Sequence, residues 1–74
     1  MIKINGERWR VLSVSPTHPA LMHNDGTYAL GMCNDRNKTI YINRDLNNRY
    51  FKKVLAHELT HAAMFSYNVY LDYY

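Results

Sequence analysis

Two histidines and a glutamate in the second half of the chain have the spacing of a metal site. The sequence reads His57-Glu58-Leu59-Thr60-His61, so the histidines are four residues apart. On a helix, residues at this spacing lie on one face, with their Cβ atoms about 5–6 Å apart. Two imidazoles placed in this way can bind a single tetrahedral Zn²⁺. The pattern therefore predicts His57 and His61 as zinc ligands.

Glu58 has a chemical role in this pattern that does not require it to bind the metal. It follows the first histidine directly, where it can accept a proton from a water that the metal activates. This is the general-base role in metal-assisted hydrolysis of peptides, and it predicts Glu58 as the catalytic residue. A purely structural role for the histidines, in the core or on a polar surface, stays open because short motifs also occur by chance.

The motif requires a helix, and the surrounding sequence predicts one over about residues 46–67. This stretch has no proline or glycine, and it is rich in residues that favour helices. Asp45 is the predicted N-cap, and Asn68 is the predicted left-handed residue after the last turn. Apolar residues fall on two stripes of this helix, which predicts that it is largely buried and that its histidines lie in a dry environment.

A first hairpin is predicted over about residues 2–14. Asn5-Gly6 is a strong signal for a two-residue hairpin turn, and residues that alternate between apolar and polar flank it. Pro16 and Pro19 end the second strand, because proline cannot donate to a strand ladder.

A second hairpin is predicted over about residues 27–42, after a loop or short turn at 20–26. Its turn is the polar segment 34–38, and its last strand, 39–42, is rich in β-branched and aromatic residues. Strands followed by one long helix indicate an α+β fold, with a small antiparallel sheet of two hairpins packed on the C-terminal helix.

The whole chain, residues 1–74, is predicted to be a single small domain. A domain of this size has a modest core and often gains stability from a metal, from disulfides or from oligomerisation. Cys33 is the only cysteine, so an internal disulfide cannot form. A free cysteine fits a reducing cytoplasm, and Cys33 is expected to be a small apolar core residue.

Charge and composition indicate which partners to expect. The net charge is +3, but the basic residues are scattered along the chain, so nucleic acid is not an expected partner. Seven tyrosines are many for this length, and tyrosine is common at interfaces, which favours a protein partner or a homo-oligomer. The sequence has no apolar run long enough to predict a membrane span, and no segment typical of a signal peptide.

A catalytic zinc site normally has three protein ligands and one open position, and the motif provides two. The longer motif with a third histidine is absent, because Met64 and Tyr67 stand where glycine and histidine would be. Asp72 is the only acidic residue after the motif, and it is a candidate third ligand if the helix ends before it. His18 and His23 are also able to bind metal, although both fit a polar loop.

The chain resembles the ImmA/IrrE-like zinc metallopeptidases, in particular short members carried by phages and other mobile elements. The matching stretches are Gly31, the strand at 38–42 and the helix segment at 54–62, within a resemblance over roughly residues 9–67. It implies a zincin-like sheet packed on the active-site helix. The resemblance implies a zincin-like half that is truncated after this helix.

The resemblance also implies a set of roles for the motif. His57 and His61 would bind zinc, Glu58 would act as the base, and a third, acidic ligand would come from a later helix. The residues that follow His61 leave no room for such a helix.

Two functions remain open after this comparison. One is hydrolysis of a peptide or protein substrate by a zinc-activated water. The alternative is a catalytically incomplete phage protein that binds and inhibits a bacterial host defence protein. Both place the chain in the cytoplasm of a bacterial host.

Overall fold

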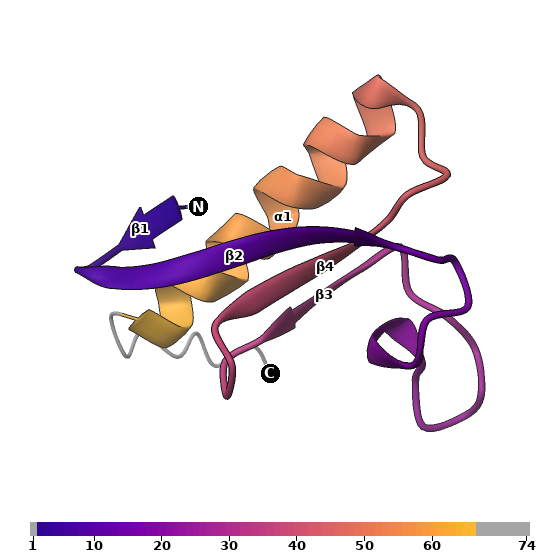
Figure 1. Ribbon diagram of the computed structural model, residues 1–74, viewed down its shortest axis with the longest axis horizontal. Helices are drawn as coiled ribbons and strands as arrows, with labels where there is room; N and C mark the ends of the chain where they lie inside the picture. Colours follow the sequence, from indigo (N-terminus) through magenta and orange to yellow (C-terminus); the bar gives the residue numbers. More distant parts are fainter. Residues whose placement is uncertain (1, 67–74) are drawn as a thin grey trace, which may run out of the picture.

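The computed structural model describes residues 2–66, which form a four-stranded sheet with one helix packed on it (Figure 1). This is the predicted α+β arrangement. The elements in chain order are β1 (Ile2–Ile4), β2 (Glu7–Val14), the 3₁₀ helix η1 (Pro19–Leu21), β3 (Gly31–Asn34), β4 (Thr39–Asn43) and α1 (Asn48–Ser66).

Both predicted hairpins are present. β1 and β2 pair antiparallel through a turn in which Asn5 has φ 50° and Gly6 has φ 80°. Two positive φ values are the requirement of the hairpin turn that Asn-Gly favours. β3 and β4 also pair antiparallel, and the Asn34 side chain supports their turn by accepting hydrogen bonds from the backbone N–H groups of Arg36 and Asn37.

The prediction of a purely antiparallel sheet is wrong, because the two hairpins join through a parallel pair. The strand order is β1-β2-β4-β3, and β2 runs parallel to β4 with Val11 opposite Ile40. Hairpin signals are local and do not specify how two hairpins associate. β4 therefore occupies a central position, which explains why Thr39, Ile40 and Ile42 are fully buried.

The segment between the hairpins is more structured than the sequence predicts. η1 lies at Pro19–Leu21, and the His18 side chain caps it by accepting a hydrogen bond from the Ala20 N–H. β3 begins only at Gly31, so the prediction of a strand from residue 27 is wrong. Residues just before it form a single isolated bridge between Met22 and Tyr28 instead.

One face of α1 packs on the sheet. The core consists of Trp9, Ile40, Ile42 and Ala62, with partly buried apolar residues of α1 around it. On α1 only Glu58 and Ala62 are buried, and His57 is exposed. The prediction of a helix buried on both sides, with histidines in a dry environment, is therefore wrong. A single layer of sheet can cover only one stripe of a helix.

The helix begins later than predicted, and its N-cap is Asn47. The Tyr50 N–H donates to Asn47 Oδ1 at 3.0 Å, which is the usual contact of an N-cap side chain. Asp45, the predicted cap, lies in the preceding turn, where its N–H donates to Asn43 Oδ1 at 2.8 Å. The predicted helix end at Tyr67 and the predicted Asn68 cap lie outside the described residues.

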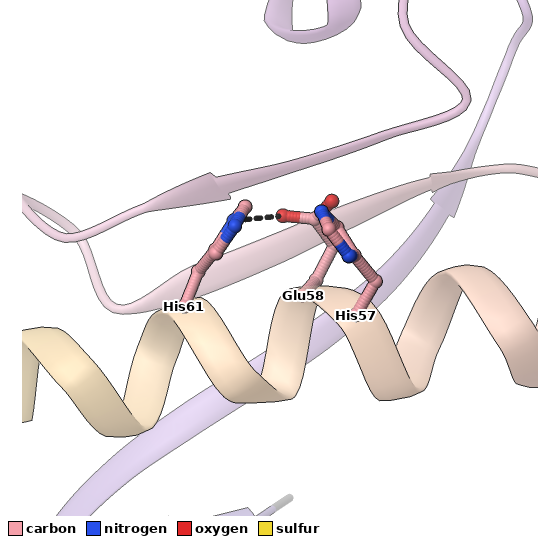
Figure 2. A group of neighbouring side chains, drawn as sticks. All are labelled: His57, Glu58 and His61. Atoms are coloured by element: carbon pink, nitrogen blue, oxygen red, sulfur yellow. Dashed lines mark ion pairs between the residues drawn. The ribbon is translucent and has the colours of Figure 1, made fainter. Parts of the chain in front are cut away.

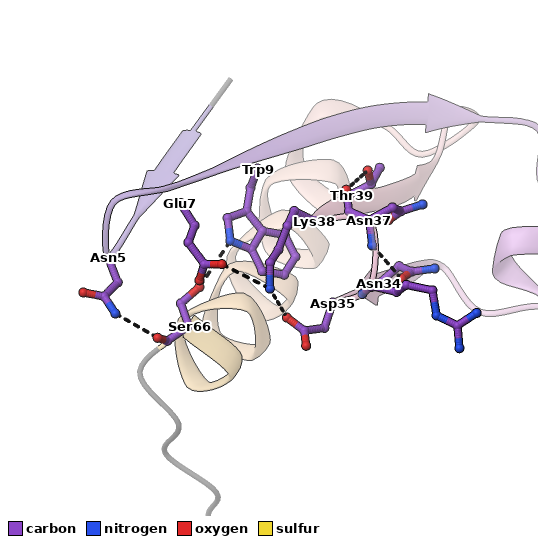
Figure 3. A network of polar contacts seen from close by, with 10 residues as sticks. Asn5, Glu7, Trp9, Asn34, Asp35, Asn37, Lys38, Thr39 and Ser66 are labelled. Atoms are coloured by element: carbon purple, nitrogen blue, oxygen red, sulfur yellow. Dashed lines mark hydrogen bonds and ion pairs between the residues drawn. The ribbon is translucent and has the colours of Figure 1, made fainter.

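Polar contacts fix the last turn of α1 to the first hairpin (Figure 3). The Trp9 indole N–H donates to Ser66 Oγ at 3.2 Å, and the Asn5 amide donates to the Ser66 carbonyl at 2.8 Å. The Lys38 ammonium lies 5.4 Å from the centroid of the Trp9 ring. It also pairs with Asp35 at 2.6 Å and with Glu7 at 3.3 Å.

Within residues 2–66, no helix has both the length and the apolar character needed to cross a membrane.

The position of the N-cap gives a test of the helix start. Asn47→Ala is expected to lower the free energy of unfolding by about 1 kcal/mol, because the Tyr50 N–H loses its partner. Asp45→Ala is the matched control, and it is expected to change stability by less than about 0.5 kcal/mol. Urea unfolding of both variants measures the difference. An equal loss in the two variants would contradict the assignment of Asn47.

Candidate metal centre

Helix α1 brings His57, Glu58 and His61 together on one side (Figure 2). One ligand atom from each of the three lies within 4.8 Å of the others. The two imidazole rings have centroids 4.5 Å apart and meet edge to face. This is the proximity that the spacing of four residues predicts for a helix.

The three side chains differ in their exposure to solvent: the carboxylate of the group is buried, and the two imidazoles are accessible. The His61 side chain is 40% exposed, whereas that of Glu58 is 7% exposed. His57 is exposed. The imidazoles therefore face solvent, and the carboxylate lies beneath them against the sheet.

The donor set fits a zinc ion in type and position. Imidazole nitrogen is a common zinc ligand, and a metal between two histidines leaves room for a further ligand and for water. Within residues 2–66, the group that could hold a metal consists of His57, Glu58 and His61. The candidate third ligand Asp72 lies outside the described residues.

The other metal-binding residue types in the described chain are not brought to this centre. His18 caps η1 and stacks on the Tyr41 ring. His23 lies in the loop after η1, where its backbone N–H donates to the Thr27 carbonyl. Cys33 packs against the hydrophobic core. The structure therefore supports the expectation that these three residues have local structural roles.

Glu58 is held in a defined position between the helix and the sheet. Its Oε1 atom lies 3.3 Å from His61 Nδ1. A carboxylate that is removed from solvent loses hydration, so it has a strong tendency to interact with a nearby proton donor. Glu58 is thus held beside the imidazoles, with its carboxylate against the sheet.

Gly31 allows β3 to approach α1 at this point. A Cβ atom on Gly31 would lie 2.5 Å from Val54 Cγ1 and 3.2 Å from the Glu58 Cγ atom. The first distance is shorter than the contacts that real Cβ atoms make, so a larger residue at this position would require Val54 or its surroundings to shift. Sequence reasoning did not assign a role to Gly31 beyond its match to a family. The available signal was a glycine in the interior of the strand predicted from residue 27, a position that often marks a close backbone approach.

Cys33 lies two residues after Gly31 on β3 and therefore faces the same side of the sheet. Burial raises the pKa of its thiol to about 12, and the negative charge of Glu58 acts in the same direction. The thiol thus stays protonated at neutral pH. Zinc ligation and nucleophilic attack both require the thiolate, so these surroundings favour a core role.

The contact at Gly31 can be tested with a double-mutant cycle. Gly31→Ala is expected to lower the free energy of unfolding by about 1–3 kcal/mol, because the new methyl group overlaps Val54. In Gly31→Ala/Val54→Ala the overlapping Cγ1 atom is gone, so the double variant should be more stable than the sum of the single effects by about 1 kcal/mol. Urea unfolding measures all four proteins. Simple additivity would show that β3 and α1 do not approach as described.

The raised pKa of Cys33 predicts slow alkylation of the folded protein. With iodoacetamide at pH 9, the folded chain should react at least about 50-fold more slowly than the chain in urea, because only the thiolate reacts. The folded chain also keeps a proton that the unfolded chain loses as the pH rises above 9. Its free energy of unfolding should therefore fall in that range, and this fall should be smaller in Cys33→Ala. Equal alkylation rates would refute the assignment.

Comparison with known proteins identifies the family. A model of the family Peptidase_M78, described as the IrrE N-terminal-like domain, matches residues 11–72. Searches of curated proteins and of solved structures gave no match. The matched range contains β3, β4, α1 and all three residues of the metal centre. It covers well over half of the sequence and confirms the resemblance noted above, so the chain belongs to the family of IrrE N-terminal-like domains, Peptidase_M78.

Proposed function

We propose that this protein is a zinc-dependent peptidase that hydrolyses peptide bonds. The observation that carries the proposal is the convergence of His57, Glu58 and His61 on one side of α1, with their ligand atoms within 4.8 Å. Membership of a family of peptidase-like domains supports it.

His57 and His61 would hold the metal through their exposed imidazoles, and Asp72 is the proposed third ligand. When bound, Zn²⁺ supplies a Lewis acid that polarises the substrate carbonyl and lowers the pKa of a water. Both histidines lie on a regular helix, so the backbone fixes their separation in the absence of metal. Metal binding to such a preorganised site costs less conformational entropy.

Glu58 would move the proton during hydrolysis. Its carboxylate accepts a proton from the attacking water, whose oxygen forms a bond to the carbonyl carbon of the substrate. The same carboxyl group then donates this proton to the leaving amine as the carbon–nitrogen bond breaks. The burial of Glu58 and its contact with His61 support this role, because they hold the carboxylate in place while the reacting groups change.

The position of β3 suggests how a substrate would bind. β3 is at one end of the strand order, and it begins at Gly31, beside Glu58. An extended peptide can add to a free strand edge through main-chain hydrogen bonds. We propose that the substrate lies along β3, where the Gly31 contact keeps its scissile carbonyl near the metal centre.

Replacement of Glu58 separates catalysis from metal binding. Glu58→Gln keeps the size of the side chain but removes the base, so peptide cleavage should fall by about 10²–10⁴-fold. Zinc content, measured by elemental analysis, should stay at about one ion per chain, the number that one pair of histidine ligands can hold. Cleavage is measured with a library of proteome-derived peptides, by mass spectrometry of the new N-termini that wild-type protein and variant generate.

His61→Ala is the matched control for this experiment. It should lose both zinc and cleavage, because one of the two imidazole ligands is gone. Full activity of Glu58→Gln would refute the role of this residue. A wild-type protein that binds zinc but cleaves nothing would refute the peptidase proposal and favour the second function.

That second function is a binding protein of phage origin that inhibits a bacterial host defence protein in the host cytoplasm. One observation favours it: within residues 2–66 the group that could hold a metal consists of two imidazoles and Glu58, and the peptidase proposal already uses Glu58 as its base. Under this function, the exposed Tyr50 on the same helix is a better candidate for partner contact than Glu58.

A further inference from the structure

Three basic residues gather on the face of the sheet that lies opposite α1. Trp9 points toward the helix, so its neighbours Arg8 and Arg10 point to the other side. Lys3 pairs directly with Arg8 across the first hairpin and shares its face. All three side chains are exposed. We call Lys3, Arg8 and Arg10 the basic face.

The basic face keeps its positive charge unneutralised in the described part of the chain. Every ion pair within residues 2–66 involves either Lys38 or His61, and none involves the basic face. Lys3 and Arg8 are also like charges placed directly opposite each other, an arrangement that destabilises a hairpin. An anionic ligand that binds both side chains would remove this repulsion.

The chemistry of the surroundings favours a phosphate backbone over other anions. Arg8 and Arg10 are about 6.6 Å apart along the strand, and each guanidinium can bind a phosphate through two hydrogen bonds. The nearest exposed apolar residue on this face is Leu12, which is 39% exposed. A protein partner usually needs a larger apolar or aromatic anchor than this.

Single-stranded nucleic acid also fits less well than a duplex. Proteins that bind single strands stack the bases on exposed aromatic rings. The aromatic ring on this side of the sheet, Tyr41, already stacks on His18, and its hydroxyl accepts a hydrogen bond from the Asn37 side chain. Within the strands of this face, charge is therefore present and the ring of Tyr41 is already engaged.

We propose that the basic face binds the phosphate backbone of duplex DNA without sequence preference. The charge pattern of the sequence argued against such a surface, because Lys3, Arg8 and Arg10 are separated by other residues. The hairpin register brings them together. The net charge of +3 and the sequence pI of about 9.2 agree with a polyanionic ligand. The proposal is independent of peptidase activity, because it concerns the opposite face of the sheet.

The proposal predicts a specific dependence on salt. Each cation that neutralises a phosphate of B-DNA contributes about −0.9 to the slope of log K against log salt concentration, so three cations give about −2.7. The binding constant should then fall by about 40-fold between 50 and 200 mM salt.

A pair of matched double variants tests the location of the surface. Fluorescence polarisation with a short labelled DNA duplex of random sequence measures binding of the full chain at several salt concentrations. Arg8→Gln/Arg10→Gln should reduce the slope to about −0.9, because one cation of the three remains. Lys52→Gln/Lys53→Gln removes the same charge from exposed positions on α1 and should keep a slope of about −2.7.

Three outcomes of this assay would overturn the proposal: no binding by the wild-type protein at 50 mM salt, equal losses in the two double variants, or competition by polyglutamate as strong as that by unlabelled DNA. The second outcome would assign binding to net charge alone. The third would assign the surface to acidic polypeptides.

Lys3→Glu distinguishes a direct loss of DNA binding from a loss that is caused by misfolding. It replaces a repulsive pair with an attractive one, so the urea midpoint should stay the same or rise, while DNA binding should weaken at least tenfold. Unchanged DNA binding in this variant would contradict the proposal. Glu58→Gln should bind DNA as the wild type does, which separates the result from that of the peptidase test.

Discussion

The contact between Gly31 and α1 sets the geometry on which the metal centre depends. With no side chain at Gly31, the end strand of the sheet lies directly against Val54 and the Glu58 side chain. Because the strand lies so close, the Glu58 carboxylate is shielded from solvent, whereas the imidazoles of His57 and His61, one turn apart, remain accessible to solvent. The proposed hydrolysis needs this division, because the ligands would have to reach the metal and the substrate, whereas the base would have to keep a fixed position.

The features that could be predicted from sequence are those set by short-range geometry. The spacing of His57 and His61 specifies a shared helix face whatever the rest of the fold does. The Asn5-Gly6 turn likewise requires positive φ values that other residues rarely adopt. The family match covers residues 11–72 and therefore includes the motif on α1.

The features that were wrong or missed depend on contacts between distant segments. The parallel pairing of β2 with β4 depends on how the two hairpins pack into one core, which contains Trp9 from the first hairpin and Ile42 from the second. No local sequence signal specifies this packing. The exposure of His57 depends on which stripe of α1 faces the sheet. The displaced N-cap has a smaller cause, since Asn43 engages Asp45 in a turn and leaves Asn47 to cap the helix.

The contacts of Trp9 have a practical consequence for experiments on this protein. Trp9 is the only tryptophan in the chain, it is fully buried, and its indole N–H donates to the last described residue of α1. Indole emission depends on the polarity around the ring and on its hydrogen bond. The intrinsic fluorescence of this protein therefore reports whether the end of the helix is docked on the first hairpin. It provides an optical signal, free of any added label, for following the docking of the helix that carries the metal centre.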